Sequence, residues 1–214
     1  MKRHSMRSVI VGLTALLGLL TCGLQEVRSE EVAKPAVDDF NIESRHVDIW
    51  SDGTRISGDL WYPRGLKSGY KFPAVILCHE WGGVRSHFNQ AYASEFAAAG
   101  FIVLTFDYRA RGEIDPVPQN VNKIGRLKGA PYLSRVAKYH PVDFANHLKT
   151  PILIIVAEKE ELMDNKLHGE RVYNIVKGNV PAQYVVFSGT HFEIYGKGRK
   201  QAIQMAIEWF DKHL

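Results

Sequence analysis

Short apolar runs alternate with amphipathic stretches along the chain, which is the pattern of an α/β protein. In residues 42–50, Val47 and Ile49 fall on one side of an alternating segment, the sequence SDGT follows, and residues 56–62 form a second segment. Asp-Gly between two such segments favours a tight turn, so they predict an antiparallel β-hairpin. Residues 74–78 form a continuous apolar run, typical of a strand that is buried on both faces of a parallel sheet.

The later elements follow in turn. The Ala-rich stretch 89–100 predicts a helix that ends at Gly100, and residues 101–108 predict the next buried strand. Two further parallel strands are expected at 151–157 and 183–187. Helices are expected at 143–148, at 165–177 and, as an amphipathic closing helix, at 197–214. The order predicts an open, mostly parallel α/β sheet behind an antiparallel N-terminal hairpin.

The first 29 residues are expected to be a secretory signal peptide. Basic residues precede an uncharged run from Ser8 to Leu24, and Val27, Arg28 and Ser29 offer a small-residue cleavage site. An uncleaved membrane anchor is the alternative interpretation. Lipidation at Cys22 is a weaker one, because Thr21 fits poorly before a lipidated cysteine.

Cleavage there has three consequences for the rest of the chain. Residues 30–41 are expected to be a flexible leader and residues 42–214 the folded α/β domain. The protein is expected to be exported to the periplasm or the extracellular space, with no stable membrane insertion after cleavage. Only Cys78 would remain of the two cysteines, so no internal disulfide is expected.

Net charge argues against a nucleic-acid partner. The formal net charge of the whole chain is +4. Residues 1–29 hold four basic residues and one Glu, so they supply +3 of that charge. The chain without them is near neutral and has no basic stripe.

Four segments carry a resemblance to known proteins. PAVILCHEWGG (73–83) is similar to a third strand with its oxyanion loop, and YASEFAAAGFIVLTFDYRARGE (92–113) is similar to the helix and strand that follow. YHPVDFANHLKTPILIIVAEKEEL (139–162) is similar to the late strand before the triad acid, and residues 187–214, beginning FSGTHFEIYGKG, are similar to the His loop and last helix. Together they resemble the α/β-hydrolase superfamily, and within it the dienelactone hydrolase-like and prolyl-oligopeptidase-like esterases.

The resemblance implies a set of roles. His191 stands in the position of the catalytic base, and Glu160 in that of the triad acid, with Glu161 one register away as the alternative. The implied oxyanion loop consists of His79, Glu80, Trp81, Gly82 and Gly83, whose backbone N–H groups would stabilise the charge on the carbonyl oxygen. No cofactor is implied, and the implied partner is a small ester-like substrate. A metal site is not expected either, because His79, Glu80 and His87 lack the H-E-x-x-H spacing.

The nucleophile of the family pattern is missing. The sequence contains neither G-x-S-x-G nor G-x-C-x-G, and the stretch between Tyr108 and Pro151 has no buried apolar run. We therefore expect an α/β-hydrolase fold that is abbreviated in its centre and lacks the elbow strand, its helix and a following strand. Whether the lineage lost them or a gene model dropped them stays open.

Four other residues are alternatives for the nucleophile, which stays unassigned. They are Ser86, which is typical of a helix cap, Cys78, typical of a core residue, and Ser134 and Ser188, typical of turns.

Two functions follow from this pattern. The first is an exported hydrolase of carboxylic esters or lactones. The second is a catalytically inactive hydrolase-fold protein that at most binds a small ligand. The sequence leaves open whether the protein is an enzyme, and it does not indicate the oligomeric state.

Overall fold

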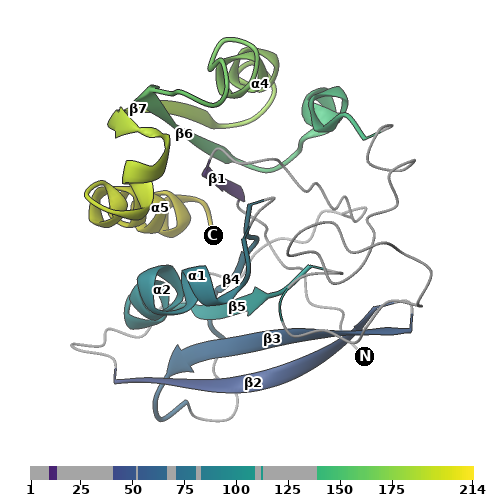
Figure 1. Cartoon of the computed structure of the whole chain (residues 1–214), viewed down its shortest axis with the longest axis vertical. Helices are drawn as coiled ribbons and strands as arrows, with labels where there is room; N and C mark the ends of the chain where they lie inside the picture. The colour runs from purple at the N-terminus through teal and green to yellow at the C-terminus, as the bar shows by residue number, and fades with distance from the viewer. Residues whose placement is uncertain are drawn as a thin grey trace. The chain divides into compact units, whose positions relative to one another are not determined.

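A computed structural model of the chain describes residues 10–13, 41–51, 53–66, 71–80, 83–108, 112 and 139–214. The chain divides into two compact units, one of residues 32–139 and one of residues 1–31 with 140–214 (Figure 1). Of the predicted signal peptide, only Ile10–Leu13 lies within the described residues, and of the predicted leader only residue 41. The signal peptide and the leader stay predictions.

The unit of residues 32–139 begins with the predicted hairpin, which is confirmed. Strand β2 (Ile42–Ser51) pairs antiparallel with β3 (Thr54–Pro63), in register from Ile42↔Pro63 to Ser51↔Thr54. The connection is two residues long. Its second residue, Gly53, has φ 75°, a left-handed conformation that costs glycine nothing because it lacks a Cβ.

Two more of the described strands belong to this sheet. Strand β5 (Ile102–Phe106) pairs antiparallel with β3 and parallel with β4 (Ala74–Leu77), which gives the order β2-β3-β5-β4. The link from β4 to β5 is helical, but it is not the single helix that the sequence predicts. It consists of α1 (Ser86–Phe88), the π-helical turn η1 (Asn89–Ala93) and α2 (Ser94–Ala98).

Strand β4 differs from the prediction that both of its faces are buried. Val75 is buried, whereas Ala74 and Ile76 are exposed, Ile76 to 60%. Successive residues of a strand point to opposite faces, so the face of β4 that carries Val75 is covered and the face that carries Ala74 and Ile76 is open among the described residues.

The second unit holds a parallel sheet with β6 in its centre. Strand β6 (Ile152–Lys159) lies between β1 (Ile10–Leu13) and β7 (Ala182–Thr190) and is parallel to both. Its helices are η2 (Pro141–His147), α4 (Gly169–Val176), η3 (His191–Tyr195) and α5 (Arg199–His213). The predicted strands at 151–157 and 183–187 and the predicted closing helix are confirmed.

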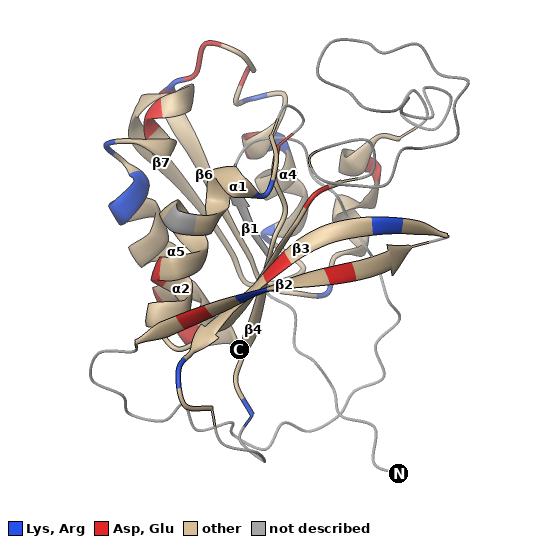
Figure 2. Ribbon diagram, turned by 60° about the horizontal axis from the view of Figure 1, so that its bottom comes forward, with Lys and Arg blue, Asp and Glu red and all other residues tan. Residues whose placement is uncertain are grey.

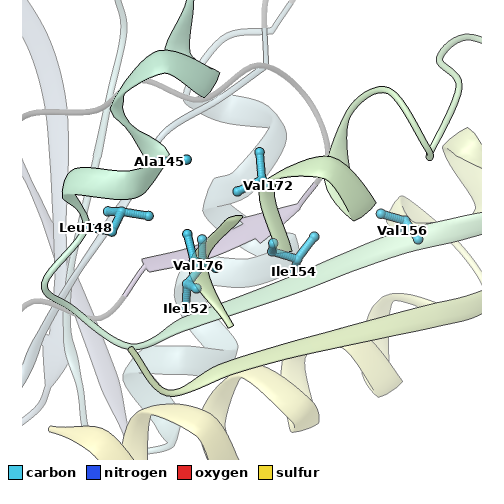
Figure 3. Packing of buried hydrophobic residues seen from close by; sticks show 7 residues of the cluster. All are labelled: Ala145, Leu148, Ile152, Ile154, Val156, Val172 and Val176. Carbon is cyan, nitrogen blue, oxygen red and sulfur yellow. The ribbon is translucent and has the colours of Figure 1, made fainter. Parts of the chain in front are cut away.

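Alternate residues of β6 build two cores, one on each face. Ile152, Ile154 and Val156 pack against η2 and α4, where they meet Ala145, Leu148, Val172 and Val176 (Figure 3). Leu153 and Ile155 pack on the opposite face with residues of β7, η3 and α5, namely Phe187, Ile194, Ala202 and Trp209. Burial on both faces explains why residues 152–157 read as an uninterrupted apolar run.

The described strands thus form two sheets rather than one. Strands β4 and β5 belong to the four-stranded sheet, and β6 belongs to the three-stranded sheet. The α/β class and the antiparallel hairpin followed by parallel strands are as predicted. Within the part of the chain that the structure describes, no helix is both long enough and apolar enough to cross a membrane.

Candidate active site

The parallel pairing of β6 and β7 brings Glu160 and His191 to the same sheet edge. Glu160 directly follows Lys159, the last residue of β6, and His191 directly follows Thr190, the last residue of β7. Lys159 pairs with Thr190, after a register shift that begins at Ala157. Since the carboxyl ends of parallel strands lie at one edge, two residues far apart in sequence become neighbours.

The two side chains form a buried hydrogen-bonded pair. His191 Nδ1 lies 2.9 Å from Glu160 Oε1 and 2.8 Å from Oε2, and the two side chains are only 8% and 4% exposed. The backbone N–H groups of Leu162 and Met163 also donate to Oε1, at 2.9 and 3.3 Å. Burial works to raise the pKa of the Glu160 carboxyl, but these hydrogen bonds, first that of His191, outweigh it and leave the pKa lowered.

This contact decides which ring nitrogen of His191 carries the proton. An ionised carboxylate can only accept hydrogen bonds, so Nδ1 is the protonated nitrogen and Nε2 keeps its lone pair. Among the described residues, Nε2 has no hydrogen-bond partner. The lone pair of Nε2 is therefore left available to accept a proton.

Glu161, the alternative acid, has a different task. Its Oε2 accepts the backbone N–H of His191 at 3.1 Å, and the imidazole contacts Glu160 instead. The turn is fixed further by a capping box, in which the Thr190 backbone N–H donates to Glu193 Oε2 at 2.9 Å. Carboxylates thus hold both the ring and the backbone of His191.

An open hollow of about 690 Å³ borders Glu160. Five of its eleven lining residues are acidic, and Figure 2 shows acidic residues in the loop that leads out of β6. The lining residues are Glu158, Glu160, Glu161, Leu162, Met163, Asp164, Asn165, Lys166, Glu170, Tyr184 and Val186.

In the other unit, His79 anchors the start of the predicted oxyanion loop. His79 is 2% exposed, and its Nε2 accepts the backbone N–H of Tyr108 at 3.1 Å. Nδ1 therefore carries the proton and donates to the carbonyl oxygen of Glu80 at 2.8 Å. Both ring nitrogens are engaged, so His79 holds the loop and is not a free base. Trp81 and Gly82 lie outside the described residues.

The end of the loop is held by an ionic network that the sequence reasoning missed. The fully buried Asp107 accepts the Arg85 backbone N–H at 2.8 Å and also pairs with the Arg85 guanidinium. The guanidinium also donates to Asp59 at 2.9 Å, and Asn89 donates to the same carboxylate at 2.6 Å. The available signal was an aspartate placed directly behind an apolar strand.

The structure assigns no nucleophile either. Ser86 is exposed at the start of α1, Ser188 donates to Glu158 at 3.0 Å, and Ser134 lies outside the described residues. Cys78 is exposed rather than in the core, yet desolvation raises the pKa of its thiol, and the hydrogen bond with Tyr108 offsets this only in part. Within the described part of its unit, His191 receives no hydrogen bond from a Ser or Cys side chain.

Metal ligands do not gather in the described residues. No group of three or more His, Cys, Asp or Glu side chains among them has the arrangement of a metal site.

The comparisons of sequence give only partial matches. No protein-family model matches the chain. Over 102 residues the chain is 34% identical to an uncharacterized 31.7 kDa Escherichia coli protein of the traX-finO intergenic region, and this match covers 46% of the chain and 28% of that protein. Over 69 residues it is 32% identical to the uncharacterized protein PA2218 of Pseudomonas aeruginosa, covering 32% of the chain and 18% of that protein. The matches thus span less than a third of either relative.

Comparisons of structure cover more of the chain. A crystal structure of PA2218 from P. aeruginosa has a TM-score of 0.58 at 14% identity, over 90% of this chain and 100% of that one. The Pyrococcus furiosus esterase Pf2001 has a TM-score of 0.58 at 15% identity, over 80% of this chain and 93% of that one. A putative dienelactone hydrolase from Klebsiella pneumoniae has a TM-score of 0.61 at 17% identity, over 80% of this chain and 99% of that one.

The sequence identities to these three structures are low, so the structural similarity is evidence for the fold alone. The strands, the hairpin and the neighbours agree, and the chain has the α/β-hydrolase fold.

Proposed function

We propose that this protein is an exported hydrolase of carboxylic esters or lactones, in which His191 is the base and Glu160 orients it. The observation that carries the proposal is the buried contact of His191 Nδ1 with the Glu160 carboxylate at 2.8 Å. A carboxylate in this position selects the tautomer with a basic Nε2 and stabilises the imidazolium that forms when Nε2 takes a proton. The hydrolase and esterase neighbours support the same class of reaction.

The chemistry can proceed with water as the nucleophile. His191 Nε2 removes a proton from water while the water oxygen attacks the carbonyl carbon, and a tetrahedral oxyanion forms. As this intermediate collapses, the ester C–O bond breaks and the imidazolium returns the proton to the leaving alkoxide. The products are a carboxylic acid and an alcohol, or one hydroxy acid from a lactone. The loop from His79 to Gly83 stays the predicted source of oxyanion N–H donors.

A second candidate is an inactive hydrolase-fold protein. It is favoured by the absent pentapeptide motif and by the lack, in the described part of the unit, of a Ser or Cys that hydrogen-bonds to His191. An acyl-enzyme route needs such a nucleophile next to the base. The loss of the elbow segment is part of both proposals, and only activity separates them.

Hydrolysis of 4-nitrophenyl acetate by the full chain tests the choice. The wild type is compared with His191→Ala and with His147→Ala, which removes an exposed imidazole on η2 of the same unit. The control matters because surface imidazoles attack activated esters on their own. General-base catalysis contributes about 10²- to 10⁴-fold in rate.

We expect His191→Ala to lose at least about 100-fold of the rate above the buffer blank, since that is the lower end for general-base catalysis, and His147→Ala to keep it. Equal rates in the wild type and His191→Ala, both at the blank, would reject the hydrolase and leave the inactive protein.

A further inference from the structure

The N-terminal strand β1 comes from the segment whose composition predicts a signal peptide, yet the structure places it in a sheet. Ile10–Leu13 runs parallel to β6 over four residue pairs, from Ile10↔Ile152 to Leu13↔Ile155. Strand β7 occupies the other edge of β6. Both edges of β6 are therefore paired while β1 is in place.

The edge of β6 that meets β1 is suited to accept a strand. Residues 152–157 are each at most 5% exposed. Successive residues of a strand direct their backbone N–H and C=O groups to opposite sides. The backbone groups of about two of the four paired residues of β6 therefore point toward β1. Buried backbone groups need partners. The stretch 152–157 has no charge, proline or glycine, which are devices that proteins use to block a sheet edge.

We propose that this edge of β6 is a strand-accepting surface, occupied by Ile10–Leu13 in the uncleaved chain. The juxtaposition that carries the inference is a four-residue parallel register between a predicted leader and the central strand of the sheet. Main-chain hydrogen bonds supply the binding, as in the addition of a peptide strand to a sheet edge. The proposal does not depend on the hydrolase activity.

The consequence is a conflict between two uses of the same residues. An export signal must leave the folded chain to be threaded and cut, whereas β1 is held beside β6. Folding of this unit therefore retains the N-terminal segment, and export requires the segment to stay unpaired. Cleavage before residue 30 removes β1 and leaves the edge of β6 open to solvent or to another strand.

Hydrogen exchange tests the pairing in the full chain, made by cell-free synthesis so that no processing occurs. The variant Val11→Pro/Gly12→Pro removes two successive N–H groups, one of which must point toward β6 whichever way the strand faces. The control Leu16→Pro/Leu17→Pro changes the same apolar run outside the paired register. The readout is the exchange rate of amides in the peptide 151–158, with a peptide from α5 as the internal reference.

We expect about two amides of Ile152–Ile155 to exchange at least about tenfold faster in the Val11→Pro/Gly12→Pro variant, because local opening exposes them. The α5 peptide and the Leu16→Pro/Leu17→Pro control should match the wild type. Equal protection of the peptide 151–158 in all three proteins would overturn the proposal.

A disulfide trap decides the case if the proline variant unfolds and the α5 reference loses protection as well. In a chain with Cys22→Ser and Cys78→Ser, Val11→Cys is combined with its register partner Leu153→Cys or with Val156→Cys. The second position lies about 10 Å farther along the strand, beyond the roughly 7 Å that a disulfide spans between Cα atoms. We expect oxidation to link residues 11 and 153 at least tenfold more than 11 and 156. Equal yields would refute the register.

Discussion

The substitution Glu160→Gln should destabilise the second unit, and the size of the effect follows from the contacts of the carboxylate. Glu160 accepts His191 Nδ1–H through both oxygens and the backbone N–H groups of Leu162 and Met163 through one. Gln keeps a single acceptor oxygen, so one of these donors loses its partner or the imidazole changes tautomer. A hydrogen bond to a charged group contributes about 1.5–3 kcal/mol, and the burial of both side chains leaves little solvent screening. We therefore expect Glu160→Gln to lower the free energy of unfolding by about 2 kcal/mol at pH 7.

The pH dependence has a definite sign. In the folded chain the pKa of the Glu160 carboxyl lies below its ordinary value of 4.5, because the hydrogen bonds outweigh the opposing effect of burial. Near that pH the unfolded chain binds more protons than the folded one, so stability rises with pH. The contribution of Glu160 is complete above about pH 4.5 and is lost as the pH falls through the folded value. The Gln variant cannot titrate there.

Urea unfolding followed by tryptophan fluorescence, at pH values from 7 down to 3, measures this difference. The control is Glu208→Gln, the same change at an exposed position on α5, which should alter the free energy of unfolding by less than about 1 kcal/mol. Equal stability of wild type and Glu160→Gln at pH 7 would refute the reasoning. So would a difference that persists undiminished at pH 3.

Three further outcomes follow from the unit of residues 32–139. Gly112→Ala should lower the free energy of unfolding by about 1–2 kcal/mol, because Gly112 has φ 53° and an added Cβ would meet a buried carboxylate. The control Gly178→Ala, with open space around its Cβ, should be neutral or stabilising. Urea unfolding compares the two variants. His79→Leu should lower the free energy of unfolding by about 1–3 kcal/mol, because the Tyr108 backbone N–H loses its acceptor. The shift of the urea unfolding midpoint measures this loss. Desolvation raises the pKa of the Cys78 thiol above 9.0. In a chain without the other cysteine, alkylation of Cys78 by iodoacetamide should therefore be slower at pH 8 than alkylation of free cysteine. The alkylation rate should still increase with pH above pH 9. A rate that levels off below pH 9 would contradict the last of these.

The apolar pattern predicted most of the elements because burial and periodicity are local properties. The strand expected at 151–157 is β6 (Ile152–Lys159), which is buried on both faces over residues 152–157, and the hairpin turns at SDGT as expected. The helix expected at 89–100 is interrupted by a π-helical turn, which tertiary contacts impose and composition does not reveal. The helix expected at 165–177 begins only at Gly169, because the Asn165 side chain instead donates to the carbonyl oxygen of Ala157 at 2.7 Å.

The candidate site could be predicted only in part. The resemblance pointed to His191 and Glu160, but a run of charged residues cannot tell Glu160 from Glu161, since only the turn after β6 decides which carboxylate faces the ring. The pairing of Arg85 with Asp107 joins residues 22 apart in sequence and left no periodic trace. The apolar run that Cys78 continues predicts a core position, yet Cys78 lies one residue beyond the end of β4 and is exposed.

The most direct test of the central claim compares Glu160→Gln with Glu161→Gln in the hydrolysis of 4-nitrophenyl acetate. If Glu160 sets the tautomer of His191, its substitution should lower the rate by at least about 100-fold, since an amide in place of the carboxylate favours the wrong tautomer. Glu161 contacts only the backbone of His191, so its substitution should change the rate less than about tenfold. Equal losses in the two variants, or a Glu160→Gln rate equal to that of the wild type, would contradict the claim that Glu160 and His191 act as one catalytic pair.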